Sequence, residues 1–150
     1  MVNFYKFVLL VFVFLLVGAC AAGQISASAN EANMEEISKE ANEAIIDGDY
    51  DKAMKLALPY AESNDPEALF TVGMIMLEWL GDSAATSKPT FTAEDALAYV
   101  RKAADAGVTQ AAGILRAGYQ FGRYSLPEDE ELAKCWRSVE RGEKQAAECS

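Results

Sequence analysis

The sequence predicts an all-α domain in which about three helical hairpins stack into a short α/α solenoid, preceded by an N-terminal signal peptide. Three observations support this fold. Apolar residues recur at helical spacing through most of residues 34–142, turn and capping residues divide this stretch into segments, and small and bulky positions repeat from one segment pair to the next. No segment of useful length alternates apolar and polar residues as a strand does.

Residues 1–19 have the pattern of a secretory signal peptide. Lys6 gives the first residues a positive charge, residues 7–17 are an unbroken apolar run, and residues 18–22 are all small. The apolar stretch is shorter than the roughly 20 residues that cross a bilayer, and no basic stop signal follows before Lys39. Cleavage is therefore favoured over a retained membrane span.

Cys20 decides which kind of exported protein is predicted. Val17-Gly18-Ala19-Cys20 resembles a bacterial lipobox, and the resemblance implies that Cys20 becomes the diacylated first residue of a lipoprotein. Ala21 as the next residue then implies the periplasmic side of the outer membrane. Alternatively, Ala19-Cys20-Ala21 fits the A-x-A pattern of ordinary signal peptidase, which would release a soluble periplasmic or secreted protein.

A tether of mainly small and polar residues, 20–33, leads into the predicted helical domain of residues 34–150. Helices are predicted over about residues 34–46, 50–62, 66–80, 92–106, 109–120 and 125–142. A loop of small and polar residues, 81–91, separates the third helix from the fourth.

Local residues mark the ends of these helices. Asp65 is a suitable N-cap, and Pro66 fits the first helical position. Residues 92–95 resemble a capping box with aspartate in place of glutamate. Gly107 suits the left-handed conformation that often ends a helix.

The helices that come second in each predicted hairpin share a column of alanines. Ala53, Ala96 and Ala133 lie 43 and 37 residues apart, and the extra residues of the longer spacing fall in the 81–91 loop. Each alanine is followed three residues later by a large apolar residue and preceded four residues earlier by a capping residue. These companions are Leu56, Tyr99 and Trp136, and Asp49, Thr92 and Asp129.

The first helices of the last two hairpins match in the same way. The aligned pairs are Ala68 with Ala111, Val72 with Leu115, and Met76 with Tyr119. Alanine lets two helices approach closely, and a bulky residue of a neighbouring hairpin fills the remaining space. Hairpins that cannot bury their own apolar faces therefore stack on one another.

These columns resemble the Sel1-like repeat family, a relative of the tetratricopeptide repeats. The matching residues are Ala68, Val72, Gly73, Asp95, Ala96, Tyr99, Lys102, Ala103, Ala104 and Gly107, then Ala111, Leu115, Tyr119, Gly122, Pro127, Asp129, Ala133 and Trp136. The resemblance implies that the first helices of the repeats line a concave face that binds another protein.

Several residues depart from the family pattern. Met76 replaces tyrosine, Leu132 replaces lysine, and residues 139–141 replace the last Lys-Ala-Ala. Arg116 stands at a glycine position, which casts doubt on a close helix approach in the last hairpin.

The amino-acid composition restricts which partners and which catalytic or metal-binding functions are expected. The net charge is -10, from 13 basic and 23 acidic side chains, and the chain has no histidine. Nucleic acid and anionic lipid repel such a chain, so we expect no nucleic-acid partner and membrane contact through a lipid anchor only. Histidine is the commonest general base and metal ligand, and the chain also has no Ser-x-x-Lys, Walker or C-x-x-C motif. We therefore predict no catalytic residues, no metal site and no cofactor.

Cys135 and Cys149 are a candidate disulfide, because export leads to an oxidising compartment. A continuous helix would hold them about 21 Å apart, so the bond requires a chain reversal, for which Gly142 lies midway. The alternative is a buried Cys135 with a free Cys149.

Four aromatic residues are candidate contacts for a partner protein. Trp79, Phe121 and Tyr124 fall outside the strict repeat columns, and Tyr119 lies in one. Aromatic side chains dominate interface hot spots, so some of these residues are candidate anchors, but most of the aromatics outside the columns are expected to cap the core.

We thus expect a membrane-anchored periplasmic scaffold that binds another protein and is not an enzyme. A specific version is an immunity or inhibitor protein that neutralises a toxin. The alternatives are an envelope hydrolase, β-lactamase-like or acting on the cell wall, and an accessory lipoprotein of envelope or secretion assembly.

Overall fold

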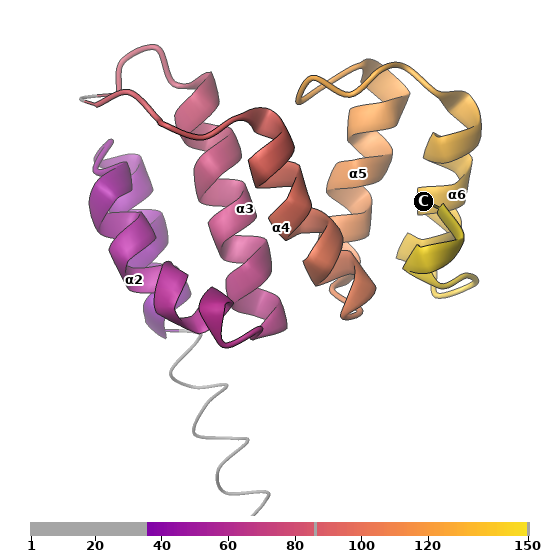
Figure 1. The fold of residues 1–150 in the computed structure, drawn as a ribbon, viewed down its shortest axis with the longest axis horizontal. Coiled ribbons are helices and arrows are strands. Elements are labelled where there is room, and N and C mark those ends of the chain that lie inside the picture. The colour runs from indigo at the N-terminus through magenta and orange to yellow at the C-terminus, as the bar shows by residue number, and fades with distance from the viewer. Residues whose placement is uncertain (1–35, 86, 150) are drawn as a thin grey trace, which may run out of the picture. The chain divides into compact units, whose positions relative to one another are not determined.

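The computed structural model describes residues 36–85 and 87–149, and every regular element in these residues is a helix (Figure 1). The predicted all-α class is confirmed for this part of the chain. The predicted signal peptide, Cys20 and the 20–33 tether lie outside the described residues. Residues 37–150 form one structural unit.

The helices follow the predicted order. Residues 36–46 are helical and are called the 36–46 helix below. The other helices are α2 (Tyr50–Glu62), α3 (Pro66–Gly81), α4 (Ala93–Asp105), α5 (Thr109–Phe121), α6 (Glu130–Glu140) and the 3-10 helix η1 (Ala146–Cys149). Bounds of α2 to α5 agree with the sequence prediction to within about one residue.

The predicted start of the sixth helix, within residues 125–128, is wrong. Tyr124 and Ser125 have φ angles of 59° and 64°, a left-handed conformation that an α-helix of L-residues does not contain. The helix begins instead after Asp129, whose side chain accepts a hydrogen bond from the Leu132 amide at 2.9 Å. Pro127 therefore lies in the loop before the helix.

The second helices α2, α4 and α6 all begin with a side-chain cap at the repeated position. Asp49 accepts from the Lys52 amide at 3.0 Å, and Asp129 acts in the same way in α6. Thr92 and Asp95 form the predicted capping box. The hydrogen bonds from the backbone and hydroxyl of Thr92 lower the pKa of Asp95, because they stabilise its charged form.

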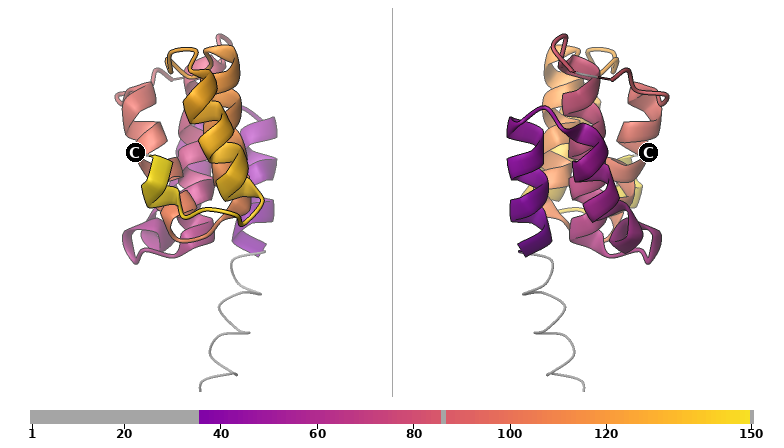
Figure 2. Two further views of the ribbon diagram at one scale, coloured as in Figure 1. Left: turned by 90° about the vertical axis from the view of Figure 1, so that its right-hand side faces the viewer. Right: turned by 90° about the vertical axis from the view of Figure 1, so that its left-hand side faces the viewer.

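Consecutive helices pack side by side from α2 to α6, and Figure 1 shows them in a row in chain order. Viewed along this row, the 36–46 helix and α4 lie on opposite sides of the unit (Figure 2). The alanine column lies at the helix contacts: Ala53 and Ala96 are 0% exposed and Ala133 is 3% exposed. Small side chains at these positions let the helix axes approach.

Gly73 allows the closest approach between α3 and α4. A Cβ atom added at Gly73 would lie 2.7 Å from Val100 Cγ2 and 3.2 Å from the Ala96 carbonyl oxygen. Such distances are shorter than van der Waals contact, so a glycine is needed where α3 crosses α4.

The last hairpin uses a different contact. Arg116, which occupies the equivalent position in α5, directs its guanidinium to Glu140 of α6, with 2.8 Å between Nε and Oε2. Its Nη1 also donates to Gln120 at 2.9 Å. A Cβ at Gly113 would meet the same Glu140 at 3.2 Å. Helices α5 and α6 therefore still pack closely. The Arg116–Glu140 ion pair stands there in place of the contact between Gly73 and Val100 in the preceding hairpin.

The glycine contact predicts a contrast between two substitutions in α3. We expect Gly73→Ala to destabilise the protein by about 1–3 kcal/mol, because its methyl group would force α3 away from α4. Gly81→Ala is the matched control, since nothing lies within 4 Å of the added Cβ. Urea denaturation followed by far-UV circular dichroism measures both. Equal stabilities of the two variants would contradict the packing described here.

Candidate interaction surface

Trp79, one of the aromatic residues predicted to contact a partner, caps the core instead. It is only 7% exposed. Its ring stacks on Tyr50 with a centroid distance of 5.6 Å and meets Phe91 edge-on at 5.4 Å. Its indole N–H donates to the Ser87 carbonyl at 2.9 Å. A side chain held in this way is not available as an exposed anchor.

The same cluster fixes the long loop after α3. The Tyr50 hydroxyl donates to Asp82 at 3.0 Å, and the Ser87 hydroxyl donates to Asp51 at 3.1 Å. Burial raises the pKa of Tyr50, and the hydrogen bond to Asp82 raises it further. These contacts tie the start of α2 to the loop, so the insertion between α3 and α4 has a structural role.

The other three predicted aromatic residues lie at the end of α5 and in the loop after it. Phe121 is 54% exposed, and the Arg123 guanidinium carbon lies 5.3 Å from its ring centroid. Tyr119 and Tyr124 are half-buried. Of the four candidates, Phe121 alone presents more than half of its surface to solvent.

A groove of about 550 Å³ lies between the 36–46 helix and α3. Both walls are first helices of their hairpins. The lining residues are Ser38, Asn42, Ile45, Ile46, Glu67, Phe70, Thr71, Met74 and Glu78.

The groove combines apolar side chains with carboxylates. Ile46 is 84% exposed, and Ile45, Phe70 and Met74 are half-buried. Single exposed apolar residues are ordinary on protein surfaces, whereas several that line one concave site indicate a binding surface. We refer to Ile45, Ile46, Phe70 and Met74 as the groove apolar set.

The sequence analysis did not single out the groove apolar set. A usable signal is present in α3, where Glu67 and Glu78 are the only charged residues among 16. A helix that is apolar on nearly all sides has more apolar surface than two neighbouring helices can cover. Phe70 and Met74, four residues apart on one face of α3, are half-buried and line the groove.

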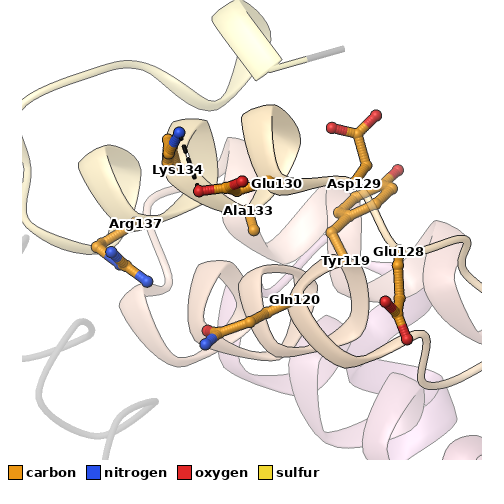
Figure 3. A pocket seen from close by; sticks show the side chains of 8 residues that line it. All are labelled: Tyr119, Gln120, Glu128, Asp129, Glu130, Ala133, Lys134 and Arg137. Carbon is orange, nitrogen blue, oxygen red and sulfur yellow. Dashed lines mark ion pairs between the residues drawn. The ribbon is translucent and has the colours of Figure 1, made fainter.

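A second pocket, of about 520 Å³, lies between α5 and α6 (Figure 3). Its lining is charged and polar, and includes Tyr119, Gln120, Glu128 and Arg137. Lys134 lies 3.1 Å from both Glu130 and Glu131, and hydrogen bonds to these two carboxylates raise its pKa. The pocket contains charges of both signs, with three carboxylates, Glu128, Asp129 and Glu130, and two cations, Lys134 and Arg137.

The end of the chain is held against α6 and α4 by η1. Cys135 and Cys149 lie at disulfide distance, with Cα atoms 5.7 Å apart. The chain reverses where predicted, at Gly142, whose φ is 72°. Cys149 and Trp136 are buried at this contact, and the Trp136 indole N–H meets no acceptor in the described residues.

Within residues 36–85 and 87–149, no group of three or more acidic or cysteine side chains is arranged to hold a metal ion. No helix in the same residues is long and apolar enough to span a membrane.

Comparison of the chain with family models, with curated proteins and with solved structures finds no match. The resemblance to Sel1-like repeats thus rests on the residue columns and stays a prediction. The structure itself shows that consecutive helices of the described residues pack on one another and that the alanine column is buried.

The cysteine pair predicts a measurable contribution to stability. The two residues are separated by 14 positions, and closing a loop of this size stabilises a protein by roughly 3 kcal/mol. We expect Cys149→Ser to lower the free energy of unfolding by about this amount in urea denaturation. Reductant should lower the free energy of unfolding of the parent protein by the same amount and should not lower that of the variant further. An unchanged parent stability in reductant would contradict the bond.

Proposed function

We propose that the protein is a binding module that holds a segment of another protein in the groove between the 36–46 helix and α3. The observation that carries this proposal is the groove apolar set, which lines one concave site, with Ile46 84% exposed and the other three residues half-buried. Partner proteins commonly use such grooves by inserting apolar side chains between two helices.

We also propose that the module belongs to the Sel1-like type of α/α repeat and acts in the bacterial envelope. Repeated caps and alanines in α2, α4 and α6 support the repeat type. The lipobox-like residues that end at Cys20 support an exported lipoprotein on the periplasmic side of the outer membrane. An immunity role requires a toxin as the bound protein, and an assembly role requires a component of the envelope or of a secretion system.

Two substitutions test the groove. Ile46→Asp combined with Met74→Gln places polar atoms in it, and the high exposure of Ile46 keeps the core intact. Affinity capture from envelope extracts of the native cells, quantified by mass spectrometry, should show the main partner reduced at least about tenfold.

Leu80→Asp provides the matched control, because Leu80 is 38% exposed and does not line the groove. We expect this variant to capture the partner as well as the parent protein does. Equal capture by the groove variant and the parent protein would refute binding at this groove.

The anchor has its own test. A metabolic fatty-acid label should be incorporated into the parent protein and lost in Cys20→Ser, because the acyl chains attach to that cysteine. Gel fluorescence of the purified proteins measures the label. Equal labelling of the two forms would refute lipidation at Cys20 and leave the soluble periplasmic or secreted alternative.

A further inference from the structure

We propose that the segment bound in this groove is a basic amphipathic helix, with an apolar face and with lysine or arginine near both of its ends. This inference rests on the proposed function of the same groove and adds the chemical class of the partner. It follows from the shape of the groove, from the placement of its carboxylates, and from the shortage of cations around it.

The shape suits a helix. The groove runs between two helices, and a third helix that packs on a helix pair makes contacts of the kind that already join α3 to α4. Its apolar residues come from both walls, with Ile45 and Ile46 on one side and Phe70 and Met74 on the other. Its volume of about 550 Å³ lies in the range that ligand sites occupy, and it suits a few inserted apolar side chains better than a whole domain.

The carboxylates stand at separated points along one wall. Glu67 lies in the first turn of α3 and Glu78 near its end. Eleven residues of helix separate them, which corresponds to about 16 Å along the helix axis. Phe70 and Met74 lie between them on α3, so the predicted complement is basic, then apolar, then basic.

Positive charge is scarce on the two helices that form the walls. Together they carry five carboxylates and a single lysine, Lys39, which does not line the groove. Neither Glu67 nor Glu78 forms an ion pair within residues 36–85 and 87–149. An incoming lysine or arginine therefore finds a carboxylate that no neighbouring cation already neutralises.

The same charges disfavour other occupants. A second copy of the chain would bring another net charge of -10 against an acidic groove. An anionic lipid surface would be repelled in the same way, and an acidic or purely apolar helix would leave the two carboxylates without partners.

The test uses two peptides of about 16 residues, the length of α3. Both carry leucine at helical spacing on one face. One has lysine on the remaining positions and the other has glutamate. Isothermal titration calorimetry of each peptide with the full protein, at low and at physiological salt, gives the affinities. We expect the lysine peptide to bind and the glutamate peptide not to bind.

Matched charge variants locate the site. Glu67→Gln with Glu78→Gln should weaken binding of the lysine peptide about tenfold. Glu62→Gln with Glu94→Gln removes the same charge from exposed positions outside the groove and should leave the affinity within about twofold.

Three outcomes would overturn the inference. Equal binding of both peptides would show that charge does not select the partner. Equal weakening by the two charge variants would show attraction to the whole acidic protein. Self-association that Ile46→Asp abolishes, without peptide binding, would identify a second copy as the occupant. Capture of the natural partner through Ile46 and Met74 tests the proposed function separately, since it does not depend on the charge of the bound segment.

Discussion

Close side-by-side packing of consecutive helices is the constraint on which the rest of this structure depends. The packing requires small residues where helix axes approach, and the chain supplies them as Ala53, Ala96 and Ala133, with Gly73 at the tightest crossing. The 36–46 helix and α3 line the groove beside these contacts, with Ile46 84% exposed and with Phe70 and Met74 half-buried. The groove therefore forms where the first helices of two stacked hairpins lie side by side.

The sequence was sufficient for the features that local chemistry determines. Asp49, Thr92 and Asp129 cap helices as predicted, because a side chain that accepts a hydrogen bond from the amide three residues later needs no tertiary information. The alanine column was recognisable because each hairpin repeats the same contact. Gly142 reverses the chain and brings Cys135 and Cys149 together, as their spacing around a glycine had indicated.

The features that depend on neighbouring helices were not predicted. The sequence favours a core-capping role for most of the aromatic candidates without showing which ones, and Trp79 is buried because Ser87 and Phe91 of the loop after α3 pack against it. The start of α6 was misplaced because two successive non-glycine residues, Tyr124 and Ser125, adopt left-handed conformations that their side chains do not favour. Ile46 and Met74 are apolar residues of amphipathic or apolar helices, and only the arrangement of the helices shows that Ile46 is 84% exposed and that Met74 is half-buried at the groove.

The disulfide-held η1 has a consequence for how the unit loses its structure. Apart from the contact of η1 with α4, the main helix contacts in the described residues join sequence neighbours, and such stacks fray from their ends inward. One end is stapled covalently through Cys135 and Cys149, whereas the described contacts of the 36–46 helix are non-covalent. The groove lies among the described helices at the far end of the row from this covalent link, so an occupant would add contacts there and raise the free energy of local opening around the 36–46 helix.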